Sequence, residues 1–157
     1  ASAVNFNSPG QVVVAGNAEA IARVTELAKA AGAKRALLLD VSVPSHCALM
    51  KPAAERLAEA MQSIVFNAPT VPVLHNVNVA EASEPGEIRA LLVEQLFRPV
   101  RWVETVQAIA GRQAEIVLEA GPGKVLTGLV KRIDKTLAAM PVFDPASLQN
   151  AMESINA

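Results

Sequence analysis

The stretch Ser42-Val43-Pro44-Ser45-His46-Cys47-Ala48-Leu49-Met50 joins an apolar segment to an amphipathic helix. Residues 36–41, just before it, are almost all apolar and predict a strand. After it, apolar residues recur at helical spacing over residues 49–64 and predict a helix. The order of strand, short loop and helix indicates an α/β fold.

His46 lies on the loop of this unit. A position just ahead of a helix N-terminus favours the neutral ring that a general base requires. The alternative is a polar loop histidine without a chemical task, and position alone does not decide between the two. Cys47 beside it suggests a cysteine-histidine pair, but a nucleophile and its base are normally distant in sequence. We therefore treat His46 as a candidate base and do not assign Cys47 as a nucleophile.

Four motifs follow one another along the chain: NFNSPGQ at 5–11, SVPSHCALMKP at 42–52, QLFRPVRW at 95–102 and EAGPGKVLTG at 119–128. Together they resemble the malonyl-CoA:acyl carrier protein transacylases of bacterial fatty acid synthesis. One such motif is weak evidence, but four in order with compatible intervals make a chance match improbable. The resemblance extends over nearly the whole chain.

The resemblance implies a fold in two parts. Residues 1–42 would be part of a ferredoxin-like small subdomain whose first elements precede Ala1. Residues 43–157 would be the C-terminal part of an α/β-hydrolase-like acyltransferase domain. The expected class is therefore α/β.

The family's nucleophile has no counterpart in the chain. Members are about twice this long and carry the nucleophile in an earlier Gly-x-Ser-x-Gly elbow, a pattern that this sequence lacks. The family's oxyanion-hole glutamine and its malonyl-binding arginine also have no match. We interpret the chain as the C-terminal half of a transacylase, expect it to be inactive alone, and count the missing N-terminal half among its partners.

The resemblance also implies roles for three residues. His46 would be the base that moves protons while a malonyl group passes from coenzyme A to the phosphopantetheine thiol of acyl carrier protein. The main-chain carbonyl of Gln95 would hold the other ring nitrogen. Asn7 would lie near the substrate pocket, although fixing the turn at residues 8–10 is an equally good role for it. No metal and no other cofactor are implied.

Basic residues form two pairs, Lys34-Arg35 and Lys131-Arg132, the second with Lys135 close by. Acyl carrier proteins are strongly acidic, so both pairs are candidates for carrier-protein docking. The alternative is an ordinary solvated surface.

Composition excludes several classes of function. The 157 residues carry a net charge of −1 and only 3% aromatic residues, which argues against nucleic-acid binding. The apolar runs are far shorter than a membrane span needs.

Cys47 is the single cysteine, which excludes an internal disulfide and favours a reducing compartment. With no basic, apolar leader, the cytoplasm is the expected location. His75 has no partner at ligand spacing and predicts no metal site.

Two other functions compete. A polyketide-type acyltransferase would share this architecture, but Pro44, two residues before His46, departs from the aromatic or serine residue common there. The second alternative is an inactive fragment that only docks carrier protein.

The segment Gly121-Pro122-Gly123-Lys124 is not a phosphate loop. A Walker motif has four residues between its first glycine and its Gly-Lys pair, and Ser or Thr after that pair.

Hydrophobic spacing and turn residues predict the remaining elements. Asn17 and Gly32 would bound a helix. Further helices are expected at residues 85–95, 103–111, 124–133 and 145–155, and strands at 11–15, 71–74, 114–119 and 137–143.

Overall fold

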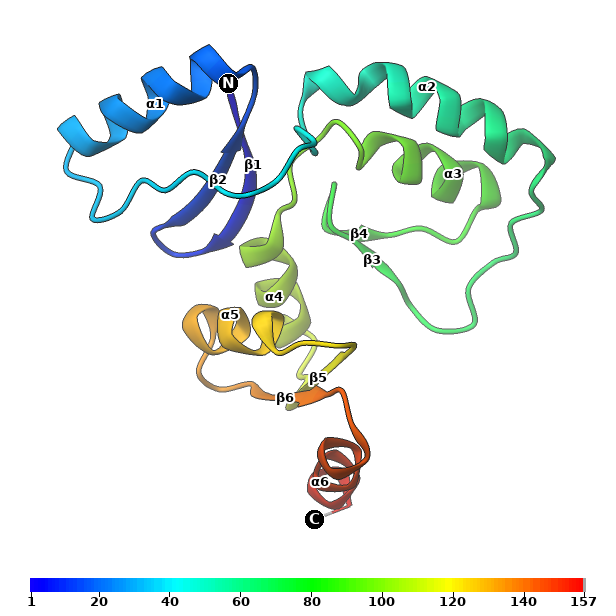
Figure 1. Cartoon of the computed structure of the whole chain (residues 1–157). Helices are drawn as coiled ribbons and strands as arrows, with labels where there is room; N and C mark the ends of the chain where they lie inside the picture. Colours follow the sequence, from blue (N-terminus) through cyan, green and yellow to red (C-terminus); the bar gives the residue numbers. More distant parts are fainter. Residues whose placement is uncertain (157) are drawn as a thin grey trace. The chain divides into compact units, whose positions relative to one another are not determined.

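The computed structural model, which describes residues 1–156, begins with a β-hairpin (Figure 1). Its strands are β1 (Ser2–Ser8) and β2 (Gln11–Ala15). Gly10, at φ +76°, occupies the left-handed region that glycine enters at no steric cost, which permits the tight turn. Helix α1 (Ala18–Ala30) follows, with Asn17 before its first residue and Gly32 at φ +88° after its end. The predicted strand at 11–15 and the predicted helix are confirmed.

The chain divides into two compact units. The first comprises Ala1–Phe6 and Val12–Arg101, and the second comprises Asn7–Gln11 and the residues from Trp102 onward. The hairpin tip thus belongs to the second unit. In the first unit, β1 also lies beside Val100, whose amide donates to the Val4 carbonyl (2.8 Å) and whose carbonyl accepts from the Phe6 amide (3.0 Å).

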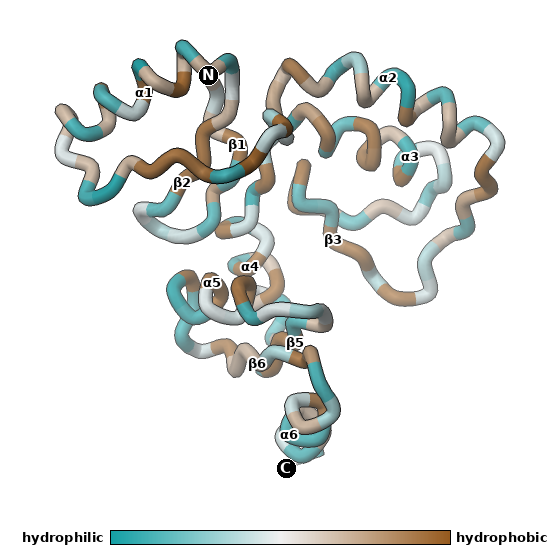
Figure 2. Tube along the Cα trace, viewed as in Figure 1, coloured by the Kyte–Doolittle hydropathy of each residue, from teal (hydrophilic) through white to brown (hydrophobic). Residues whose placement is uncertain are grey.

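The strand predicted at residues 36–41 is wrong. The segment lies in irregular backbone, and the Val41 amide donates to the Leu39 carbonyl two residues away (2.9 Å), a local turn that a strand ladder does not contain. Leu37 and Leu38 are 74% and 82% exposed. Figure 2 shows the segment as a brown, hydrophobic stretch interrupted by a polar residue. A strand forms only against a neighbour, and each sheet in the described residues has two strands.

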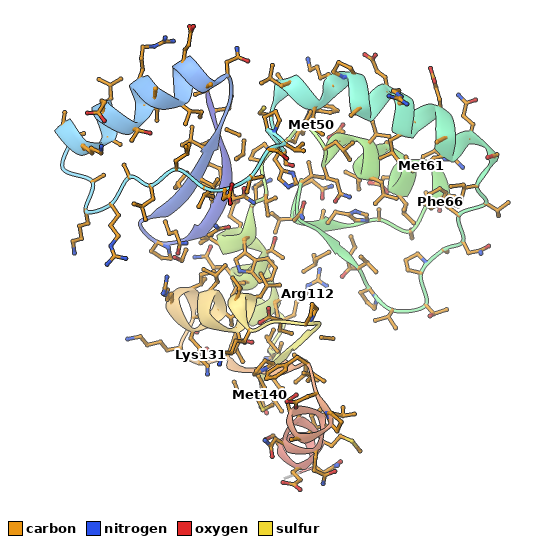
Figure 3. All side chains as sticks on the ribbon, in the orientation of Figure 1. Met50, Met61, Phe66, Arg112, Lys131 and Met140 are labelled. Carbon is orange, nitrogen blue, oxygen red and sulfur yellow. The ribbon has the colours of Figure 1, made fainter. Side chains whose placement is uncertain are left out.

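The helix predicted after His46 is confirmed. It consists of a 3-10 turn (Ala48–Met50), α2 (Lys51–Ala60) and a second 3-10 turn (Met61–Ser63). Met50 and Met61, the residues on either side of α2, are labelled in Figure 3. Its companion α3 (Pro85–Glu94) packs against α2, and it ends one residue earlier than predicted.

A short antiparallel pair precedes α3. Strand β3 (Leu74–His75) pairs with β4 (Ala80–Glu81), so the extended segment expected at 71–74 forms a ladder only at its end. Val77, Ala82 and Leu91 form a small buried cluster that joins this hairpin to α3. The cluster fixes the position of α3 and therefore of its C-terminal end.

The second unit is a parallel strand pair with covering helices. It contains α4 (Trp102–Gly111), β5 (Ile116–Ala120), α5 (Val125–Ile133), β6 (Ala138–Val142) and α6 (Pro145–Ile155). Strands β5 and β6 are parallel with α5 as their crossover, which is an α/β arrangement. The buried core consists of Val106, Val130, Leu137 and Ala139. These elements confirm the helices and strands predicted between residues 103 and 155.

Helix α6 starts where its sequence provides a cap. The Asp144 carboxylate accepts the Ser147 amide (2.7 Å), and the Ser147 hydroxyl accepts the Asp144 amide (3.0 Å). This reciprocal pair is a capping box, which satisfies two amides that a helix N-terminus leaves free.

Candidate active site

His46 occupies a tight turn immediately before the first 3-10 turn of the α2 segment. Its backbone has φ +63°, the left-handed region that residues other than glycine enter uncommonly. The His46 amide donates to the Leu96 carbonyl (2.9 Å), just past the end of α3. The side chain is half-buried. Unusual backbone geometry of this kind persists only where surrounding contacts hold it, and it is frequent at functional sites.

The ring of His46 is held by the same short segment. Its Nδ1 lies 2.6 Å from the main-chain oxygen of Gln95. A carbonyl oxygen can only accept, so Nδ1 carries the hydrogen, and in the neutral ring the lone pair is then on Nε2. The ring is therefore set in the tautomer in which Nε2 can accept a proton.

Gln95 follows the last residue of α3, at the negative end of the helix dipole. Leu96 is the next residue along the chain, and the main-chain oxygens of Gln95 and Leu96 receive the two hydrogen bonds from His46. Hydrophobic spacing indicated only the helix that follows His46, and the Gln95 carbonyl was expected from the family resemblance alone. The end of α3 comes 49 residues later in the chain, and only tertiary structure brings it to the ring.

Asn7 lies near the end of β1 and is half-buried. The next residue, Ser8, is buried and donates its hydroxyl to the Gln11 side chain (3.3 Å), which closes the hairpin turn. Asn7 belongs to the second unit and His46 to the first. Its role in substrate binding therefore stays a prediction.

The four predicted docking residues are all exposed. Lys34 and Arg35 follow α1 in the first unit, whereas Lys131 and Arg132 lie in the last turn of α5 in the second. Figure 3 shows Lys131 on α5. Lys131 and Lys135, together with residues 137–140, line an open groove of about 540 Å³.

The Gly121-Lys124 turn is closed by Glu119, a residue that the sequence argument did not single out. Its carboxylate accepts hydrogen bonds from the amides of Leu126 (3.0 Å) and Thr127 (2.6 Å) and from the Thr127 hydroxyl (2.7 Å). Partial burial alone would raise the pKa of Glu119, but these bonds from Thr127 and Leu126 outweigh it and lower the pKa. The first amides of α5 are thus occupied by the chain's own carboxylate, a further reason why this is not a phosphate loop.

We expect Glu119→Gln to destabilise the second unit by about 1 kcal/mol at neutral pH, because charge-assisted hydrogen bonds are lost at a partly exposed site. The folded-state pKa is lowered, so the stabilisation is complete above the ordinary carboxyl pKa and is lost as the pH falls through the lowered value. Urea unfolding at neutral and acidic pH, followed by fluorescence of Trp102, which packs on the unit's core, measures this. Glu115→Gln, at an exposed residue before the same strand, is the control. Equal stability of Glu119→Gln and the parent at neutral pH would refute the stabilising role of the Glu119 carboxylate.

Across residues 1–156, no three His, Cys, Asp or Glu side chains gather in a way that would hold a metal ion. None of the helices formed by these residues combines the length and apolarity needed to cross a membrane.

Comparison with known proteins identifies the family of this chain. The model of the acyl transferase domain matches residues 2–148. The chain belongs to the acyl transferase domain family. It is 57% identical over 151 residues to the malonyl CoA-acyl carrier protein transacylase of Salmonella typhimurium, covering 96% of this chain and 49% of that protein. The chain therefore spans about half the length of the curated relatives it matches.

Solved acyl transferase structures share the fold. A malonyl-transacylase in complex with a type II PKS acyl carrier protein is 57% identical, with a TM-score of 0.95 over 98% of this chain and 50% of that one. The acyl-carrier-protein S-malonyltransferase of Burkholderia pseudomallei is 51% identical, with a TM-score of 0.95 over 97% and 50%. The predicted family and α/β class are confirmed. The division at residues 42 and 43 stays a prediction.

Proposed function

We propose that this chain supplies the general base for malonyl transfer from coenzyme A to the phosphopantetheine thiol of acyl carrier protein. The observation that carries the proposal is the His46 ring, fixed through Nδ1 on the Gln95 carbonyl with Nε2 left to accept a proton. The relatives supply the substrate class, since those compared above are malonyl transacylases. The nucleophilic serine would come from the part of the full-length protein outside this chain.

The proposed reaction has two halves. In the first, Nε2 of His46 takes the serine proton while the serine oxygen attacks the thioester carbonyl of malonyl-CoA; the proton then passes to the departing coenzyme A thiolate. In the second, the pantetheine thiol gives its proton to Nε2 and attacks the malonyl-serine ester, and the proton returns to the serine. Protons are only relayed, so no other cofactor enters the scheme.

The end of α3 would replace the aspartate of a serine-histidine-aspartate triad. That aspartate orients the ring and stabilises the imidazolium that forms during attack. Here the Gln95 carbonyl orients the ring, and the negative end of the α3 dipole favours the positive charge. Because the contact is made by the main chain, the Gln95 side chain is not required for it.

The acyl unit that is transferred and the carrier protein that accepts it can be tested in one experiment. One relative structure pairs a malonyl-transacylase with a type II PKS carrier protein, which favours a polyketide carrier as the second candidate acceptor. Steady-state transfer by the full-length protein, with malonyl-CoA and methylmalonyl-CoA and with carrier proteins of both pathways, separates them. The proposal expects malonyl transfer to the fatty acid carrier. No transfer by the full-length protein to any carrier would refute the proposed function. We place the reaction in the cytoplasm, because the single cysteine of this chain favours a reducing compartment.

Carrier-protein docking gives a specific prediction. In the full-length protein, reversing charge with Arg35→Glu and Lys131→Glu should slow transfer to the acidic carrier protein by about tenfold at low salt, since charge steering acts on association. Formation of the malonyl-enzyme from coenzyme A should change little. The matched control is Arg23→Glu, an exposed position on α1 outside both basic pairs.

Rapid-mixing measurement of each half-reaction at several salt concentrations checks this prediction. An equal loss in both halves would point to coenzyme A phosphates or to damaged folding. No loss in either half-reaction would show that the two basic pairs are ordinary solvated surface and do not dock carrier protein.

A further inference from the structure

One polar contact in the His46 turn has no part in the proposed reaction. The Sγ of Cys47 lies 3.1 Å from the main-chain oxygen of Pro44. That oxygen can only accept, so the thiol donates its hydrogen to it. Cys47 is only 4% exposed. Its thiol is therefore buried with its proton directed at a carbonyl, which differs from the arrangement of an activated nucleophile, whose proton goes to an adjacent base.

The contact closes the turn that holds His46 in its unusual backbone conformation. A left-handed conformation at a residue other than glycine is strained and needs surrounding contacts to maintain it. Within the turn, the Ser45 amide donates to the Val43 oxygen (2.9 Å) and the Cys47 thiol to the Pro44 oxygen, and the His46 amide ties the turn to the Leu96 oxygen beyond α3 (2.9 Å). Of these, only the thiol contact is made by a side chain.

We propose that Cys47 is a positioning residue for His46. Its thiol acts as a hydrogen-bond donor that holds the turn, so that the His46 ring meets the Gln95 carbonyl in one orientation. The expected effect of Cys47 on catalysis rests on the proposed function of His46. The expected effect of Cys47 on the orientation of the ring does not. It predicts that a hydroxyl can replace the thiol, since serine supplies a donor at the same position, whereas a methyl group cannot.

The kinetic test uses the full-length protein with Cys47→Ala and Cys47→Ser. Losing one weak, buried hydrogen bond in the base's turn should lower kcat by about three- to tenfold in Cys47→Ala. KM for malonyl-CoA should stay unchanged, because the thiol is not expected to touch substrate. Cys47→Ser should keep kcat within about twofold of the parent, since a hydroxyl is at least as good a donor. Equal kcat in the parent and Cys47→Ala would overturn the proposal, and so would equal loss in both variants.

A second measurement, also on the full-length protein, does not depend on activity. Hydrogen exchange of the His46 amide, and the NMR signal of the Nδ1 hydrogen, report whether the turn and the ring are held. We expect faster exchange and a weakened ring signal in Cys47→Ala, and parent-like behaviour in Cys47→Ser. Unchanged exchange in Cys47→Ala would refute the positioning role whatever the enzyme's activity. If His46 variants instead keep full activity, the proposed function fails while this result stands.

Discussion

Replacing His46 with alanine in the full-length protein is expected to lower malonyl transfer by about 10²–10⁴-fold, the usual contribution of a positioned general base. The reason is the geometry of the ring, whose Nδ1 is engaged by the Gln95 carbonyl so that Nε2 is the atom left to take a proton. Both half-reactions should slow, because both pass a proton through Nε2. Single-turnover rates of malonyl-enzyme formation and of transfer to carrier protein measure the loss.

Two further variants separate chemistry from folding. His46→Asn removes the base but keeps a residue that tolerates the left-handed backbone found here at φ +63°. It should be as inactive as His46→Ala and unfold at the parent's urea concentration. Gln95→Ala keeps the main-chain carbonyl and should retain activity within about threefold, because the side chain is not the partner. Near-parent activity in His46→Asn would remove His46 from the mechanism.

Sequence predicted the helices well because their signals are local. The helix over 18–30 has Asn17 before it, a repeating apolar face and Gly32 beyond its end, and the helix over 125–133 follows two glycines. Spacing of 3.6 residues and the preferences of helix ends need no information from distant parts of the chain. Boundaries therefore agree within one or two residues.

The strand expected at residues 36–41 failed for the opposite reason. Its leucines have strong apolar character, but a strand exists only through hydrogen bonds to another segment, and composition does not encode whether that segment is present. Here the leucines lie largely exposed in irregular backbone. By contrast, β5 and β6 pair with each other across α5 and were both predicted.

In the candidate site, too, local features could be predicted from the sequence and tertiary contacts could not. His46 stood out because a loop histidine ahead of a helix is visible in the sequence itself. The Gln95 carbonyl came only from family resemblance, because main-chain atoms carry no sequence signal. The roles of the Cys47 thiol and the Glu119 carboxylate were missed: each bonds backbone groups that come together only after the turn has formed.

The second large effect concerns the nucleophile. The sequence contains no Gly-x-Ser-x-Gly elbow, and the thiol of Cys47 is buried against a carbonyl. We therefore expect this chain alone to form no covalent malonyl adduct, whereas the full-length protein should form one per molecule. Because a strained elbow is what exposes and activates the serine, the difference should be all or none rather than graded.

Intact-mass spectrometry after incubation with malonyl-CoA, followed by peptide mapping, tests the central claim that this chain holds the base and not the nucleophile. The account predicts an unmodified mass for this chain and, for the full-length protein, a single malonyl group on a residue outside residues 1–157. A stoichiometric malonyl group on Ser45, Cys47 or any other residue of this chain would contradict it.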